Sequence, residues 1–272
     1  MAASRPGLPK LVATDLDGTI VGMDEAPTAR TAAAFDLVAA AGIPIVGVTG
    51  RGPRLLDLCR RDLPAAGFFV LGQGANVVDL TSGAVDELFA EVMDGRLVTE
   101  VLTRLEAVVG PLSVLVEPAA AVDDRLLGEA HPAWRFTAVR SCGRQEALDG
   151  PVIKAFAHSD TYDADELLAL ARTLIGPEIV ELTQAGLGYM EICPRGVTKA
   201  TGLAVVTQHL GVDPADVLVF GDMPNDLPMF AYAGWRRVAV ANAHPELRAA
   251  ADEVIEACAD DGVARYLERL FG

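Results

Sequence analysis

Short apolar runs alternate with amphipathic stretches at both ends of this 272-residue chain. A run of four to six apolar residues between turn residues is typical of a strand buried on both faces. Alternation of such strands with helices favours an α/β fold with a Rossmann-like parallel-sheet core. The apolar runs cover residues 11–14, 43–48, 68–71, 217–220 and 238–241, and residues 28–41 have apolar residues at helical spacing.

Polar residues follow four of these runs at their carboxyl ends. Asp15 follows the first run and Thr49 the second; Asp222 and Asn242 follow the last two. In an open parallel sheet, ligands bind at the edge where the strands end. We therefore expect these four distant segments to build one site.

The middle of the chain is more irregular. Residues 113–116 and 153–157 look like strands, residues 163–174 predict an amphipathic helix, and residues 178–183 and 187–192 predict a strand pair around Gly186. We expect an inserted α/β cap domain at residues 82–186, within a core formed by residues 1–81 and 187–272.

The composition excludes several classes of partner. The 38 acidic and 22 basic residues give a formal net charge of −16, which disfavours binding to nucleic acid or to anionic membranes. A small anion can still bind where a metal sets the local field. The four cysteines form no Cys-x-x-Cys pair, which favours reduced thiols, and neither a signal peptide nor a membrane-spanning run is evident. We expect a cytoplasmic protein, either a monomer or a homodimer.

The segment Asp15-Leu16-Asp17-Gly18-Thr19 is the strongest indication of chemistry. On a continuing strand the two carboxylates would point to opposite faces, but Gly18 allows a sharp turn that brings both to one site. The alternative is an ordinary acidic turn, because Asp-Gly is a common turn signal. A buried strand that leads into paired aspartates is costly without a metal or a partner, so we favour the site.

The segment Gly221-Asp222-Met223-Pro224-Asn225-Asp226 also follows a buried strand. Carboxylate and carbonyl oxygens suit a hard cation, and few protein ligands suit Mg²⁺ better than Ca²⁺. Asp226 has an alternative role as the cap of the following helix. The two roles are compatible.

Two further segments are weak indications when each is taken alone. Thr49-Gly50-Arg51 offers a hydroxyl and free backbone N–H groups for a phosphate, although an ordinary helix cap is the preferred explanation of this segment alone. Lys199 lies early in a predicted helix, where lysine is usually solvated.

Together, and in this order, the four segments resemble the motifs of the haloacid dehalogenase (HAD) superfamily. Its Asp-x-Asp-Gly-Thr motif matches residues 15–19, its Ser or Thr matches Thr49, its lysine matches Lys199, and its Gly-Asp-x-x-Asn-Asp motif matches residues 221–226. The position of the insert resembles the Cof-type branch of phosphatases, as do residues 191–199, 240–243 and 261–264. That branch usually has Asn-Gly-Ala after its third strand, where this chain has Gln73-Gly74-Ala75.

The resemblance implies a Mg²⁺-dependent phosphatase that works through an aspartyl-phosphate intermediate. Asp15 would be the nucleophile, and Asp17 would act as general acid and then general base. The metal site would comprise Asp15, Asp17 through its backbone carbonyl, Asp222 and Asp226. Phosphate would be bound by Thr49, Gly50, Lys199 and Asn225, and the substrate or the cap would be contacted by Arg51, Gln73 and Asn242.

Several alternatives stay open from the sequence alone. A phosphomutase shares this chemistry, a receiver-type signalling domain also uses a phosphorylated aspartate, and a silent scaffold would need one of these residues to be missing. Sugar phosphates are the first expectation for the substrate, followed by pyridoxal phosphate, flavin mononucleotide or a phosphoglycerate ester of a sugar. The histidines have no metal-ligand spacing and are expected to lie at the surface or in the core, namely His131, His158, His209 and His244.

Overall fold

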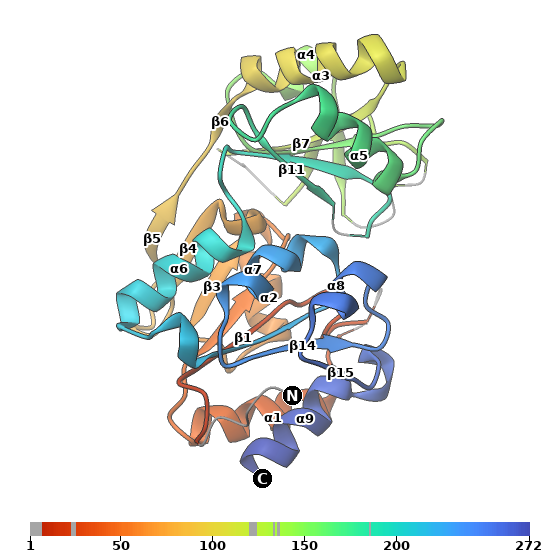
Figure 1. Ribbon diagram of the computed structural model, residues 1–272. Coiled ribbons are helices and arrows are strands. Elements are labelled where there is room, and N and C mark those ends of the chain that lie inside the picture. Colours follow the sequence, from red (N-terminus) through yellow and green to blue (C-terminus); the bar gives the residue numbers. More distant parts are fainter. Residues whose placement is uncertain (1–6, 23–25, 120–123, 133, 135–136, 185) are drawn as a thin grey trace. The chain divides into compact units, whose positions relative to one another are not determined.

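The computed structural model describes residues 7–22, 26–119, 124–132, 134, 137–184 and 186–272. The chain forms two compact units, each with its own sheet (Figure 1). The core unit comprises Met1–Arg51, Leu56–Phe89 and Thr198–Gly272, and the inserted unit comprises Gly52–Leu55 and Ala90–Val197.

The core sheet has the strand order β15-β14-β13-β1-β2-β3-β4-β5. From β15 to β3 all neighbouring strands are parallel, as the sequence predicts, whereas β4 runs antiparallel to β3. The sheet is therefore mixed. The strands are β1 Leu11–Thr14, β2 Ile45–Val48, β3 Phe68–Leu71, β4 Asn76–Asp79, β5 Asp86–Ala90, β13 Val217–Gly221, β14 Arg236–Val240 and β15 Glu253–Ile255.

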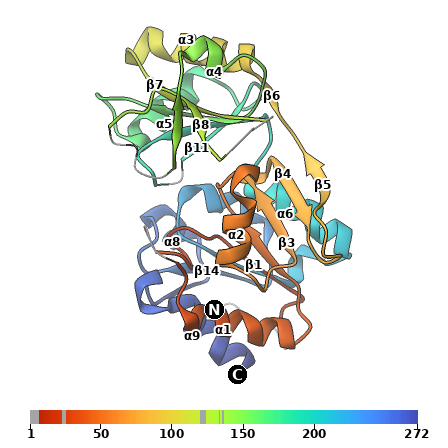
Figure 2. The same cartoon turned by 180° about the vertical axis from the view of Figure 1, so that it is seen from behind.

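Helices connect these strands, and α1 and α9 pack side by side (Figures 1 and 2). Thr28 begins α1 because its side chain accepts a hydrogen bond from the backbone N–H of Thr31. Gly42, just beyond the end of α1, adopts a left-handed backbone conformation with φ of 73°, which terminates the helix. The core helices are α1 Ala29–Ala40, α2 Leu56–Asp62, α6 Lys199–Leu210, α7 Leu227–Tyr232, α8 Pro245–Ala250 and α9 Gly262–Phe271.

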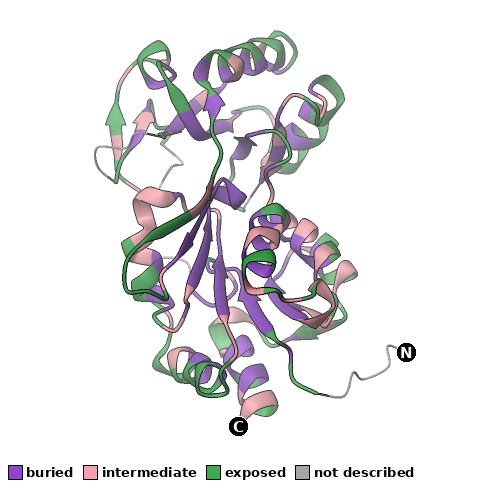
Figure 3. Cartoon of the chain, turned by 90° about the vertical axis from the view of Figure 1, so that its left-hand side faces the viewer, coloured by how far each residue is buried: buried purple, intermediate pink, exposed green. Residues whose placement is uncertain are grey.

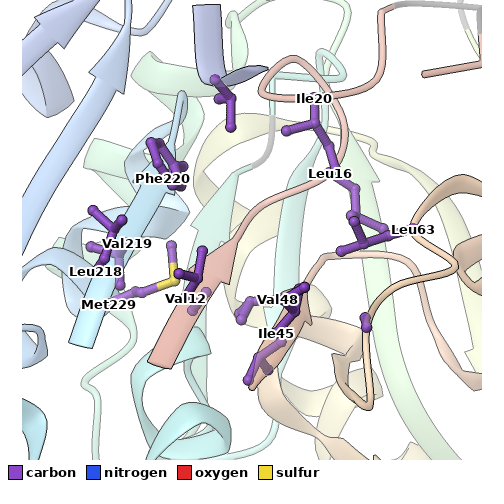
Figure 4. Packing of buried hydrophobic residues seen from close by; sticks show 14 of the residues in the cluster. Val12, Leu16, Ile20, Ile45, Val48, Leu63, Leu218, Val219, Phe220 and Met229 are labelled. Carbon is purple, nitrogen blue, oxygen red and sulfur yellow. The ribbon is translucent and has the colours of Figure 1, made fainter. Parts of the chain in front are cut away.

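The central strands are buried along their whole length (Figure 3), which explains their continuous apolar sequences. Figure 4 shows Val12 of β1, Ile45 and Val48 of β2 and Val219 of β13 within one apolar cluster. Full burial of each such side chain stabilises the fold by about 1.5–3 kcal/mol. This rigid sheet holds the loops that follow its strands.

The inserted unit contains a second sheet with the order β11-β12-β10-β7-β8-β9, and β6 pairs with β10. Its strands are β6 Met93–Asp94, β7 Ser113–Pro118, β8 Leu126–Gly128, β9 Val139–Ser141, β10 Pro151–His158, β11 Glu181–Gln184 and β12 Met190–Cys193. Its helices are α3 Gly95–Val109, α4 Arg144–Ala147 and α5 Ala164–Leu174.

Pairing of the strands explains why the long segment of this unit, Ala90–Val197, begins and ends later than the expected 82–186. The strand β5 extends the core sheet, so the chain stays with the core beyond residue 82. The strand β12 pairs antiparallel with β10 and β11, so the inserted sheet continues beyond residue 186.

None of the four cysteines, all of which lie among the described residues, forms a disulfide. Within the described residues, no helix combines the length and apolar character that crossing a membrane requires. Residues 1–6, which contribute to the expectation that a signal peptide is absent, lie outside the described residues.

Candidate active site

The turn after β1 presents two aspartates beyond the end of the strand. The backbone N–H of Asp15 still donates to the carbonyl of Phe220 in β13, at 3.0 Å, so this residue is fixed by the sheet. The chain then turns at Gly18, which has φ of 85°; a Cβ atom there would lie 2.1 Å from Oδ2 of Asp222. Glycine is therefore required both by the backbone conformation and by the close approach of the Asp222 side chain.

Three carboxylates from two strand ends converge behind this turn. Asp15, Asp222 and Asp226 are buried, and one oxygen of each lies within 4.8 Å of the others. The Thr19 hydroxyl lies 3.1 Å from Asp15 Oδ2 and 3.3 Å from Asp222 Oδ1, so it can donate to either. The fold thus concentrates negative charge where water cannot screen it.

Burial and mutual repulsion change the acidity of this group. Burial, opposed by Lys199 and reinforced by Asp226, raises the pKa of Asp15 to about 7. Burial and the neighbouring charges of Asp15 and Asp226 raise the pKa of Asp222 to about 9. Both shifts show that the ionised cluster lacks sufficient compensating positive charge.

Lys199 supplies part of the missing charge. Its Nζ donates to Asp15 Oδ1 at 2.5 Å and to Asp226 Oδ1 at 2.6 Å, and its side chain is buried. The two carboxylates raise its pKa against the opposing effect of burial. Lys199 is therefore a buried ammonium at the start of α6, not the solvated surface lysine of the alternative interpretation.

Asp226 holds the segment 221–226 together through its second carboxylate oxygen, Oδ2. Oδ2 accepts hydrogen bonds from the backbone N–H groups of Asp222 at 2.9 Å and Met223 at 3.1 Å. It makes no side-chain cap to α7, so the helix-cap alternative is not observed. Asp226 instead holds the loop that presents Asp222.

The donor set fits a hard divalent cation. Buried oxygens of three aspartates converge, and the buried Oδ1 of Asn225 has no hydrogen-bond partner in the described part of the chain. Oxygen donors of this kind suit Mg²⁺. The carboxylate of Asp17 is not part of the converging group; it is 46% exposed and pairs with Arg51.

The segment Thr49-Gly50-Arg51 lies at the end of the neighbouring strand β2. Thr49 is buried, and its hydroxyl accepts from the backbone N–H of Arg51 at 3.0 Å. Arg51 Nε and Nη2 donate to the two oxygens of Asp17, and Nη1 donates to Asp62 at 2.6 Å. Asp62 in α2 thus anchors Arg51, a contact that no sequence motif indicates. Gly50 follows Thr49 in the same loop.

Gln73 and Asn242 are held by the core unit itself. Gln73 adopts the left-handed backbone with φ of 64°, and its Oε1 accepts from Asn225 Nδ2 at 3.1 Å. Asn242 donates from Nδ2 to the Gly18 carbonyl at 2.8 Å and accepts from the Cys258 N–H at 2.8 Å. Both side chains therefore position motif loops. Their expected contacts with substrate or cap stay predictions.

We expect the stability of the metal-free protein to fall as the pH rises from about 5 to about 9. The folded-state pKa values of Asp15 and Asp222 lie above the roughly 3.9 of an unfolded aspartate, so the folded state binds more protons and loses stability as they dissociate. Urea unfolding across this pH range in EDTA measures the slope.

Saturating Mg²⁺ should flatten that slope, because a bound cation compensates the ionised carboxylates. Asp222→Asn should flatten it in EDTA as well, since one of the two titrating groups is gone. Equal slopes in EDTA and in Mg²⁺ would contradict a cation site at this cluster.

This chain is similar in sequence to known hydrolases. Residues 12–267 match the family of haloacid dehalogenase-like hydrolases. The HMP-PP phosphatase of Cronobacter sakazakii is 27% identical over 262 residues, covering 95% of this chain and 94% of that protein. The 5-amino-6-(5-phospho-D-ribitylamino)uracil phosphatase of Bacillus subtilis is 24% identical, covering 96% of this chain and 98% of that protein.

A solved structure shows the same fold. A sugar phosphatase of HAD subclass IIB superposes with a TM-score of 0.78 at 19% identity, covering 96% of this chain and 98% of that one. The chain thus shares the fold of that protein, a core unit with an inserted α/β unit. The chain therefore belongs to the haloacid dehalogenase-like hydrolases.

Proposed function

We propose that this protein is a Mg²⁺-dependent, cytoplasmic phosphatase that hydrolyses a small phosphorylated metabolite through an aspartyl-phosphate on Asp15. The observation that carries the proposal is the buried cluster of Asp15, Asp222 and Asp226 around Lys199, at the end of a parallel strand. Such a cluster is expensive to bury unless a cation and an anionic substrate use it.

The protein's own residues set up the attack. Lys199 and Thr19 contact opposite oxygens of Asp15 and thereby fix the orientation of its carboxylate. Bound Mg²⁺, held by the aspartates, would supply the positive charge that offsets repulsion between this carboxylate and the phosphoryl group. Lys199, Thr49 and the backbone N–H of Gly50 would stabilise the remaining phosphoryl oxygens.

We assign the proton transfers to Asp17. It stands two residues beyond the nucleophile, and its exposed carboxylate is oriented by the guanidinium of Arg51. It would donate a proton to the leaving oxygen and then accept one from the water that attacks the phosphorus of the aspartyl-phosphate. The second step cleaves the P–O bond, restores the Asp15 carboxylate and releases phosphate.

A phosphate-release screen with Mg²⁺ tests this proposal. The panel should hold sugar phosphates, pyridoxal phosphate, flavin mononucleotide, a phosphoglycerate ester of a sugar and the substrates named for the two relatives. We expect release of inorganic phosphate from at least one hydroxylated ester and loss of activity in EDTA. Phosphoryl transfer between positions of one sugar, without release, would instead indicate a phosphomutase.

Full activity after complete removal of divalent cations would contradict the role of the metal.

A further inference from the structure

Two imidazoles and a carboxylate converge within the inserted unit, far in sequence from every catalytic motif. His131 follows β8, His158 is the last residue of β10, and Asp160 lies in the loop that leads to α5. One possible ligand atom of each lies within 4.8 Å of the others, and His131 Nε2 lies 3.0 Å from Asp160 Oδ1. The spacing of these residues along the sequence does not indicate a metal site. The fold brings them together.

His158 is oriented as a metal-binding histidine usually is. Its Nδ1 lies 2.8 Å from the carbonyl oxygen of Gly188. A carbonyl can only accept, so Nδ1 carries the proton and the neutral ring keeps a lone pair on Nε2. Histidines that bind metals commonly donate their other N–H to a backbone carbonyl in this way.

The surrounding residues hold the three ligands in place. The buried Ser159 hydroxyl accepts from the backbone N–H groups of Thr161 and Tyr162, which fixes the turn that carries Asp160. The His158 ring stacks on His131, with ring centroids 4.3 Å apart, and on Tyr189, with centroids 4.9 Å apart. Ligands braced in this way need little reorganisation to bind.

The spacing and the donor types select a class of metal. Ligands at about 2.0–2.1 Å from a tetrahedral ion lie about 3.3 Å apart, so the 3.0 Å between His131 and Asp160 needs only a small opening. Imidazole nitrogen suits Zn²⁺ and related transition ions, whereas Mg²⁺ prefers oxygen. Asp160 is 82% exposed, which leaves solvent access for a fourth ligand.

We propose that the inserted unit binds a divalent transition-metal ion of the Zn²⁺ class through His131, His158 and Asp160. This site is separate in residues and in chemistry from the aspartate cluster of the core unit. The ion would tie together the segment after β8, the end of β10 and the loop before α5, and would thereby stabilise the inserted unit. The proposal does not depend on the identity of the phosphate ester.

Zinc titration of the metal-stripped full-length protein, in saturating Mg²⁺ and with a chromophoric chelator as competitor, tests the site. We expect one Zn²⁺ per chain, with affinity lowered by more than about 100-fold in His131→Ala and in His158→Ala, beyond the roughly 10–100-fold losses that outer-shell changes produce. Asp160→Asn, which preserves shape, should also weaken binding.

Two controls separate this site from others. His209→Ala removes an imidazole of the core unit that lies beside Asp79 and should leave zinc affinity unchanged. Asp222→Asn alters the aspartate cluster and should leave it unchanged too. Co²⁺ in place of Zn²⁺ should give the strong visible absorption of a tetrahedral site in the wild type and lose it in His131→Ala.

The proposal is overturned if the wild type binds no Zn²⁺ under these conditions, or if the histidine variants bind it as tightly as the wild type. It is also overturned if only Asp222→Asn removes binding. Circular dichroism should establish that each variant is folded; Asp160→Asn and His131→Ala carry the test should His158→Ala unfold.

Discussion

Asp15→Asn should lower kcat by at least about 10⁴-fold, because an amide cannot attack phosphorus to form the acyl phosphate. The substitution replaces a buried carboxylate with a neutral group of the same shape. It also removes one source of repulsion beside Asp222 and Asp226. The variant should therefore stay folded, and initial-rate assays on the best ester of the screen measure the loss.

A matched substitution controls for nonspecific effects. Asp57→Asn makes the same chemical change on a side chain that is 98% exposed in α2. It should retain wild-type kcat and KM. Wild-type turnover by Asp15→Asn, with Asp57→Asn as reference, would eliminate Asp15 as the nucleophile.

Lys199→Met should destabilise the fold by about 3–5 kcal/mol near neutral pH, because removing one partner leaves buried charge uncompensated. The ammonium contacts both Asp15 and Asp226, and all three side chains are buried. Activity should also be lost, since the orientation of Asp15 and part of the phosphoryl binding depend on the same ammonium. Urea unfolding and initial rates measure the two effects.

The pH dependence distinguishes this electrostatic cause from simple loss of packing. As the pH falls, Asp15 and Asp222 bind protons, and a neutral acid no longer needs the ammonium. The difference in stability from the wild type should therefore shrink. Lys10→Met removes a surface lysine that pairs with Asp216 and should leave the unfolding curve nearly unchanged. A loss from Lys199→Met that is equal at pH 5 and pH 8 would contradict this explanation.

Strands that are buried on both faces could be predicted from the sequence. The runs at residues 11–14 and 68–71 coincide with β1 and β3, because continuous burial demands continuous apolar sequence. The limits of the inserted unit could be predicted only less accurately. They depend on which sheet β5 and β12 join, and the local sequence does not encode that choice.

The same distinction applies to the sites. The motif residues Asp15, Lys199 and Asp222 come together as the strand ends require. The anchoring of Arg51 by Asp62 has no motif, and the approach of His131 to His158 depends on the sheet order, in which β8 and β10 both pair with β7. Thr19 is the last residue of the first motif, so a role at the site could be predicted from the sequence. Its contacts with Asp15 and Asp222 could be found only from the structure.

The central claim, that Asp15 becomes phosphorylated during turnover, can be tested by chemical trapping. Borohydride added during steady-state hydrolysis reduces an acyl phosphate to the alcohol, which converts a phosphorylated aspartate into homoserine. We predict that mass spectrometry will find this change at Asp15, dependent on substrate and Mg²⁺ and absent in Asp15→Asn. Rapid phosphate release with Asp15 unmodified, or with the change at another carboxylate, would contradict the account.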